Sequence, residues 1–239
     1  MARLRRLYAP NVPQLAQVTF AEPLAAVSDP TPSDKLQLLS DWLLDGVVQH
    51  QVALHGWVVL NDRIALLATT REAGDLSRLI QAVGRRFATR LRHGRVFADR
   101  YRSALIQPGR WVLPAMIWLD RLPVQLHYVD QPAMWPWSSA AAHIGAARAD
   151  TRIGPEHDHP DFWREGNTPF DRQARFSERL GSGLPETQTQ QLEKALFGQW
   201  ALGDEEFLAR IQPQVSRRTA PAPRGRPRKT AKGDSKTEA

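Results

Sequence analysis

Apolar and polar positions follow a strand rhythm in four short stretches of the first half of the chain. Residues 16–20 alternate between apolar and polar or small side chains, which predicts a first β-strand. Residues 52–60 and 64–69 are rich in β-formers and are separated by a short polar break, which predicts a hairpin. Residues 95–107 also have an extended pattern, so the sequence predicts four strands.

Between these stretches the apolar positions recur every three or four residues, which is the rhythm of an amphipathic helix. The pattern predicts helices at about 31–50, 75–94 and 110–121. Thr31 is the expected N-cap of the first helix and Pro32 its first helical residue.

The order is strand, helix, two strands, helix, strand and helix, which favours an α/β (α+β) fold. We expect a ferredoxin-like antiparallel sheet with helices on one face, followed by a small helical C-terminal region and a disordered basic tail. The predicted divisions are a ferredoxin-like domain (1–147), a linker (148–167), a helical region (168–213) and a basic tail (214–239).

Composition narrows the class of protein. Apolar residues make up 42% of the 239 residues, which is enough for a hydrophobic core. Cysteine is absent, which excludes disulfides, thiolate metal sites and a cysteine nucleophile. The sequence has no apolar run of about 18 residues and no secretory signal, so we expect a cytoplasmic protein that does not enter a membrane.

The positive charge is concentrated in two blocks. The formal net charge is +7, yet residues 71–110 carry +7 and residues 216–239 carry +6, so the rest of the chain is net acidic. Two basic blocks on an acidic body are typical of a protein that binds a polyanion. Arginines on solvated helix faces are the alternative interpretation of the central block.

Several stretches, in order along the whole chain, resemble the REP-associated tyrosine transposases of the HUH single-tyrosine superfamily. They are Met1-Ala2-Arg3-Leu4, Leu76-Ser77-Arg78, Gly84-Arg85-Arg86-Phe87, Phe97-Ala98-Asp99-Arg100-Tyr101-Arg102-Ser103, Asp130 through Trp135-Pro136-Trp137-Ser138-Ser139, Trp200-Ala201-Leu202-Gly203 and Pro223-Arg224-Gly225-Arg226-Pro227.

The resemblance implies a specific chemistry. In the family, two histidines on a central strand bind Mg²⁺ or Mn²⁺, a tyrosine on the following helix attacks phosphorus, and a polar residue one turn later helps to hold the metal. This sequence has Arg63 and Ala65 at the histidine positions, Trp118 at the tyrosine position and Leu122 at the polar position. We therefore expect a degenerate member with no catalytic residues, no metal site and no cofactor.

Other residues with suitable chemistry do not replace this set. Tyr128 follows Pro123 and is expected to lie beyond the helix, and Tyr101 is expected in the core or as a stacking residue. His157-Asp158-His159 has the chemistry of metal ligands, but it falls in the predicted linker and is expected to be a solvated loop.

Arginines are the predicted nucleic-acid contacts. In the folded part a phosphate track is expected from Arg85, Arg86, Arg90, Arg92, Arg95, Arg100 and Arg102. In the tail, Arg224-Gly225-Arg226, followed by Arg228-Lys229, resembles an AT-hook that binds the A·T-rich minor groove. A chance match in an arginine-rich and proline-rich tail is the alternative.

Three functions remain open from the sequence. The first is a transposase-family protein that binds hairpin or single-stranded DNA on the nucleoid without cleavage and strand transfer. The second is an active DNA transposase with a rebuilt metal and nucleophile site. The third is a non-catalytic regulator that binds RNA hairpins. The oligomeric state is open.

Overall fold

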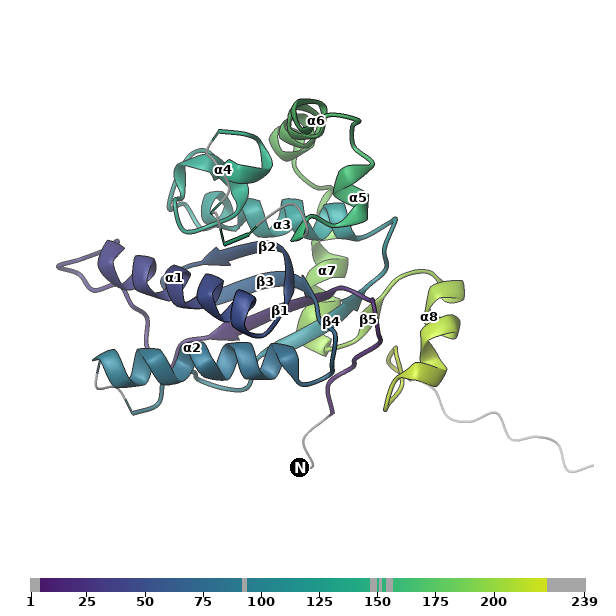
Figure 1. Cartoon of the computed structure of the whole chain (residues 1–239), viewed down its shortest axis with the longest axis horizontal. Coiled ribbons are helices and arrows are strands. Elements are labelled where there is room, and N and C mark those ends of the chain that lie inside the picture. Colours follow the sequence, from purple (N-terminus) through teal and green to yellow (C-terminus); the bar gives the residue numbers. More distant parts are fainter. Residues whose placement is uncertain (1–4, 92–93, 147–149, 151, 154–156, 223–239) are drawn as a thin grey trace, which may run out of the picture.

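The structure is a computed structural model that describes residues 5–91, 94–146, 150, 152–153 and 157–222 (Figure 1). Its strands are β1 (Gln14–Thr19), β2 (Ala53–Val59), β3 (Arg63–Thr69), β4 (Arg102–Ile106) and β5 (Ala201–Leu202). Its helices are α1 (Ser33–Gln49), α2 (Asp75–Leu91), α3 (Val112–Gln125), α4 (Ala140–His143), α5 (Pro160–Trp163), α6 (Pro169–Ser182), α7 (Glu186–Gly198) and α8 (Glu205–Ile211).

The sheet has the strand order β2-β3-β1-β4-β5. The first four strands pair antiparallel, and β5 pairs parallel with β4. Together with α1 and α2, these four strands form the β-α-β-β-α-β arrangement of a ferredoxin-like fold. The predicted α/β fold is confirmed.

The two faces of the sheet are covered by different helices. Phe20 follows β1 and stacks on Phe87 of α2, with ring centroids 5.8 Å apart, so this side of the strand faces α1 and α2. Gln17 and its register partner Arg102 point the other way, because side chains alternate along a strand. Arg102 reaches α7 there, where its Nη1 donates to the Phe197 carbonyl at 3.1 Å.

Helices α3 and α7 therefore form a second layer opposite α1 and α2 (Figure 1). Consecutive residues of β3 from Ile64 to Ala68 are all buried, as expected for a strand that is covered on both faces. The sequence predicted helices on one face of the sheet, and α1 and α2 cover one face in this way. Helices α3 and α7 cover the other face as well. This second layer determines what surrounds the expected catalytic positions.

Two helix boundaries differ from the sequence prediction. The first helix begins at Ser33 rather than Pro32, because the Ser33 N–H donates to the Thr31 carbonyl at 2.8 Å in a tight turn and no side chain caps the helix. Helix α3 continues through Pro123 to Gln125, and the Leu126 N–H still donates to the Leu122 carbonyl at 3.0 Å. A proline in the last turn removes one donor without ending the helix.

The described part of the predicted linker is packed, not solvated. Phe162 of α5 lies in the core, with its ring centroid 5.5 Å from that of Phe176 in α6. His159 is buried, and the His157 carbonyl lies 2.6 Å from His55 Nδ1 on β2. The expectation of a solvated loop at 157–159 is wrong, because His157 and His159 contact His55 on β2 and Phe162 packs against Phe176 on α6.

The C-terminal region also packs against the sheet. Helix α7 contacts β4 and β1, and β5 extends the sheet. Residues 216–222, placed in the basic tail by the sequence, reach back to β5, where the Thr219 carbonyl accepts from the Ala201 N–H at 2.8 Å. The domain boundaries remain a prediction, and most of the tail lies outside the described residues. None of the described helices is long and apolar enough to cross a membrane.

Candidate nucleic-acid interface

The expected catalytic positions on β3 lie on the face that α3 and α7 cover. Arg63 and Ala65 are two residues apart on the strand and point to the same side. Ala65 is fully buried between its register partners, Gln17 on β1 and Val58 on β2. A methyl group at this position offers no donor atom to a metal.

Helix α3 fills the space opposite with apolar side chains. Trp118 and Leu122 are four residues apart on one side of the helix, and they are 2% and 5% exposed. Trp118 Nε1 and Gln17 Oε1 are buried without a hydrogen-bond partner among the described residues. Ala65, Trp118 and Leu122 are therefore part of the packed core.

Arg63 lies at the outer edge of this region with its charge already paired. Its Nε and Nη2 donate to Asp62 Oδ1 and Oδ2 at 2.9 and 2.5 Å. The hydrogen bond to Asp62 raises the pKa of Arg63 despite partial burial. A paired guanidinium, a methyl group, an indole and an isobutyl group do not fit a divalent cation. In the described ranges no group of three His, Asp or Glu side chains is placed to hold a metal.

A buried polar cluster fastens α3 to the Trp-Pro-Trp-Ser-Ser turn. Asp120 on α3 is fully buried, and its Oδ2 lies 2.7 Å from His143 Nδ1. Ser139 Oγ donates to Asp120 Oδ1 at 3.0 Å and accepts from the Trp57 N–H at 3.0 Å. Burial disfavours the imidazolium, but the Asp120 carboxylate outweighs it and raises the pKa of His143. Sequence reasoning missed this cluster.

The other aromatic candidates are structural as well. Tyr101 is buried, and its hydroxyl lies 3.0 Å from Ser77 Oγ. Tyr128 stacks on Trp135, with ring centroids 5.1 Å apart. Trp111, which directly precedes α3, is also buried in the core and does not present a face on which a base could stack.

An open groove runs between α2 and the segment 94–101, and it brings basic side chains together. Its volume is about 550 Å³. Arg85 on α2 lines the groove from one side, and Arg95 and Arg100 line it from the segment 94–101. Arg6, in the N-terminal segment before β1, also lines it. We call these four residues and the space between them the arginine groove. Among the described residues that line it, Asp99 is the one carboxylate, and it lies 3.8 Å from Arg95.

Arg6 is fixed at the base of this groove. Its guanidinium carbon lies 3.5 Å from the Tyr101 ring centroid, and its Nε and Nη2 both donate to the Tyr101 carbonyl at 3.3 Å. Burial lowers the pKa of Arg6, and the charge of Arg100 acts in the same direction. A partly desolvated cation beside other cations favours the binding of an anion. No pattern in the sequence indicates that residue 6 lies beside residues 85–100 in the fold.

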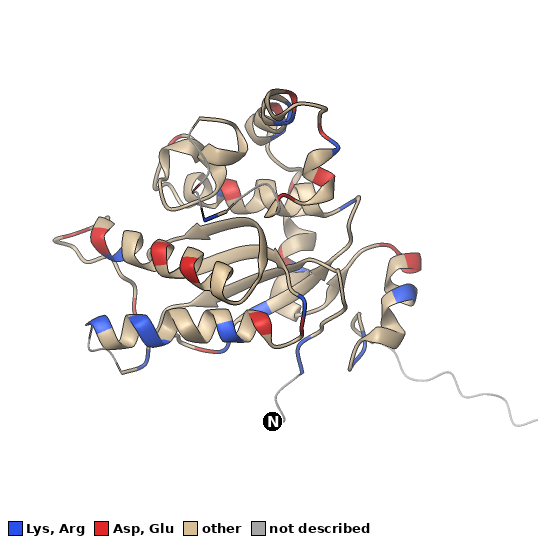
Figure 2. Ribbon diagram, in the orientation of Figure 1, with Lys and Arg blue, Asp and Glu red and all other residues tan. Residues whose placement is uncertain are grey.

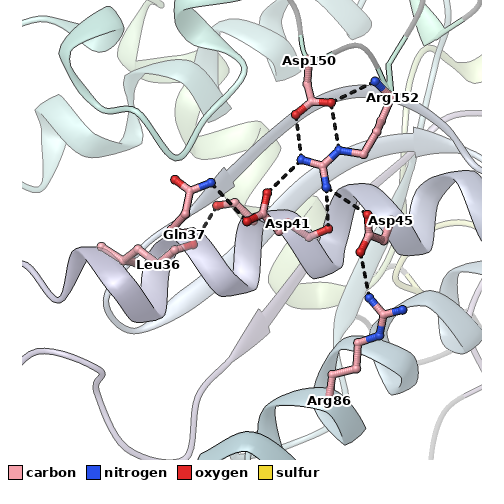
Figure 3. A network of polar contacts seen from close by, with 8 residues as sticks. Leu36, Gln37, Asp41, Asp45, Arg86, Asp150 and Arg152 are labelled. Atoms are coloured by element: carbon pink, nitrogen blue, oxygen red, sulfur yellow. Dashed lines mark hydrogen bonds and ion pairs between the residues drawn. The ribbon is translucent and has the colours of Figure 1, made fainter.

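Helix α2 and its neighbour α1 carry side chains of opposite charge. Figure 2 shows basic residues along α2 and acidic residues along α1. Arg86 on α2 pairs with Asp45 on α1 at 3.0 Å. Arg152 pairs with Asp45, Asp41 and Asp150 at 2.7–2.9 Å, and Figure 3 shows these ion pairs as one network. Arginines on this side are paired with carboxylates, whereas among the described residues those in the arginine groove have no ion-pair partner apart from the long Arg95–Asp99 contact.

The fold is similar to that of a solved REP-associated tyrosine transposase bound to a REP hairpin. The TM-score is 0.53 at 16% sequence identity, and the match covers 66% of this chain and 92% of that chain. No protein-family model matches the chain, and no curated protein matches it. At this identity the likeness shows a shared fold.

The predicted arginine contacts do not all share one surface. Arg85, Arg95 and Arg100 line the arginine groove, and Arg90 is exposed near the end of α2. Arg86 points to α1, and Arg102 lies on the opposite face of the sheet, with its guanidinium carbon 5.8 Å from the Phe197 ring centroid. Arg92, Arg224, Gly225, Arg226, Arg228 and Lys229 lie outside the described residues.

Proposed function

We propose that this chain is a DNA-binding protein with a transposase fold that binds hairpin or single-stranded DNA and does not cleave it. The observation that carries the proposal is the arginine groove, where four arginines face one aspartate on an open surface. Phosphate oxygens attract guanidinium groups strongly, and such contacts supply most of the affinity of non-specific nucleic-acid binding. The shared fold with a protein solved on a REP hairpin supports the same class of ligand.

The absence of cleavage is part of the proposal. Ala65 and Leu122 cannot ligate a metal, and Trp118 has no oxygen that could attack phosphorus. Burial of all three side chains supports a packed core rather than a site that opens to DNA.

The basic tail is proposed as a second contact. Arg224, Gly225 and Arg226 match the core of an AT-hook, in which arginines enter a narrow A·T-rich minor groove. Arg228 and Lys229 add general attraction to phosphates. Association with the nucleoid follows from this proposal.

The test is fluorescence anisotropy with a labelled palindromic DNA hairpin taken from beside the gene. Binding is measured at two salt concentrations against a scrambled strand and a matched RNA hairpin. We expect a preference for the DNA hairpin that persists at higher salt. Equal and steeply salt-dependent binding to all three probes would reduce the function to charge attraction, and preference for the RNA would favour an RNA regulator.

Cleavage is tested in the same samples after incubation with Mg²⁺ or Mn²⁺. A denaturing gel separates free DNA from a covalent protein–DNA product. We expect none, and a metal-dependent adduct would show that the chain is an active transposase with a rebuilt site.

A further inference from the structure

We propose that a pocket lined by α1, β2, α4 and α6 binds a small organic acid, with the carboxylate of the acid on Arg172 and its apolar body against Trp57. We call it the Arg172 pocket. Its volume of about 560 Å³ falls within the range of roughly 300–1,000 Å³ that is usual for small-molecule sites. The pocket is separate from the proposed DNA-binding surface, because the described residues that line it include none from the arginine groove.

Arg172 on α6 is a buried arginine without a carboxylate partner. It is 6% exposed, and none of the Asp and Glu side chains in the described part of the chain forms an ion pair with it. Arginines are rarely buried to this extent unless an anion pairs with them, because desolvation of an unpaired charge is costly. A ligand carboxylate in the pocket would supply the missing anion.

The guanidinium group of Arg172 is held in position while most of its donors remain for a ligand. Its Nη1 donates to the Gly166 carbonyl at 3.2 Å, and its central carbon lies 4.2 Å from the Trp163 ring centroid. A guanidinium group has five N–H donors, and two of them can bind one carboxylate in parallel. Arg172 is therefore oriented before a ligand arrives.

The other charges around the pocket favour a ligand with a single negative charge. Arg152, the other arginine among the described lining residues, is already paired with Asp41 and Asp150 (Figure 3). Asp158 lines the pocket as well. A phosphate monoester carries close to two negative charges at neutral pH, whereas one guanidinium group beside these carboxylates matches one charge. The pocket therefore suits a carboxylate better than a phosphate.

Much of the remaining wall is apolar. Trp57 on β2 is partly exposed, and Leu44, Leu54 and Phe162 line the pocket from α1, β2 and α5. An apolar wall with a few fixed polar groups is typical of small-molecule sites, in which the polar groups orient a ligand whose body is buried against the wall. This combination favours an acid with an aromatic or aliphatic body over a small inorganic anion.

The first experiment compares two probes of the same shape on the full-length protein, 2-naphthylacetate and its uncharged amide, 2-naphthylacetamide. Titrations followed by ligand-observed NMR measure both affinities. We expect the acid to bind with a Kd of about 1 mM or lower, which is typical of a ligand of this size. We expect the amide to bind at least about tenfold more weakly, because it lacks a charge-assisted hydrogen bond to Arg172.

A matched pair of variants locates the acid. Arg172→Met removes the guanidinium group from the pocket, and Arg175→Met removes the same charge from an exposed position of the same helix outside it. We expect Arg172→Met to bind the acid about tenfold more weakly, as the parent protein binds the amide, and Arg175→Met to bind it unchanged. Melting temperatures establish that each variant is folded.

A third variant tests the pocket without a change at Arg172. Ala142→Leu adds volume at a half-buried lining position on α4 and should weaken both probes by about tenfold, because an overpacked site costs this order of free energy. It keeps the proposal testable if Arg172→Met does not fold.

The outcomes separate this proposal from the proposed function. Equal binding of the acid and the amide, or binding of neither, overturns the Arg172 pocket as an acid site and leaves DNA binding untouched. Tighter binding of 2-naphthyl phosphate than of the acid overturns the choice of a carboxylate. Displacement of the acid by a saturating DNA hairpin would make the pocket part of the DNA surface. If the acid binds as expected and no hairpin binds, the pocket stands and the proposed function fails.

Discussion

The two sides of the central sheet differ in whether their charged side chains are buried and paired or exposed to solvent. On the side of α3, Trp118 and Leu122 close the expected catalytic positions, and the Asp120 carboxylate is buried and paired with His143. On the side of α2 the arginine groove holds four cations at an open surface, and Asp99 is the one carboxylate among its described lining residues.

This difference teaches how one fold separates stability from binding. Charges that pair inside the protein fasten elements together, as Asp120 does for α3 and Arg152 does for α1. Charges without an internal partner add little to stability but attract a ligand of opposite sign. Variants on the two sides should therefore affect different measurements.

The largest expected effect is loss of stability when the buried cluster is broken. Asp120→Ala leaves His143 and Ser139 without their shared partner, and we expect the free energy of unfolding to fall by about 3–5 kcal/mol. Urea denaturation measures this loss. The matched control is Asp99→Ala at the exposed rim of the groove, where we expect a change within about 0.5 kcal/mol. Equal effects of the two variants would remove the distinction between the two sides.

Introducing a histidine at Ala65 on β3 should lower the stability by a smaller amount. Ala65→His forces an imidazole into a fully buried strand position, and overpacking of this kind costs about 1–3 kcal/mol. Ala53→His, at a half-buried position on the edge strand β2, is the control. If Ala65→His is as stable as the parent protein and binds Mn²⁺ in calorimetry, the region between β3 and α3 has room for a metal site and is not a packed core.

The stability of the packed side should depend on pH through His55. Burial lowers the pKa of His55 to about 3, and its Nε2 lies 2.8 Å from Thr69 Oγ1. Between the unfolded pKa of about 6.5 and the folded value, only the unfolded chain holds this proton, so stability falls as the pH falls through that window. The contribution to the slope is about 1.4 kcal/mol per pH unit.

His55→Gln should flatten the slope between about pH 6 and pH 4 by that amount. His127→Asn is the control, since residue 127 is exposed and its left-handed backbone suits asparagine. An unchanged slope in His55→Gln, measured by urea denaturation at several pH values, would show that His55 is not desolvated in the folded protein.

The smallest expected effect separates two adjacent arginines. Arg85 lines the groove, whereas Arg86 is paired with Asp45. Arg85→Ala should lower the slope of log affinity against log salt by about 1, as expected for one lost phosphate contact. Arg86→Ala should change this slope less, and neither should alter the melting temperature appreciably. Identical slopes for both variants would mean that DNA does not use the groove.

Local patterns in the sequence were sufficient for most elements. Two runs of β-formers with a polar break between them predicted the β2–β3 hairpin, and apolar positions at helical spacing predicted α2. Such elements can be predicted because the preferences of neighbouring residues agree with the secondary structure that the whole fold requires. Pro123 misled the prediction of α3, because packing of the helix outweighs one missing donor.

The sequence by itself determined most of the secondary structure, the ferredoxin-like order of elements and the identity of the residues at the expected catalytic positions. Only the tertiary structure decided which arginines are neutralised, since Arg86 meets Asp45 and Arg152 meets Asp41 across long stretches of chain. It also brought Arg6 to the groove and Asp120 to His143. The physical reason is that secondary structure depends on residues a few positions apart, whereas pairing and burial depend on which faces the packed layers bring together.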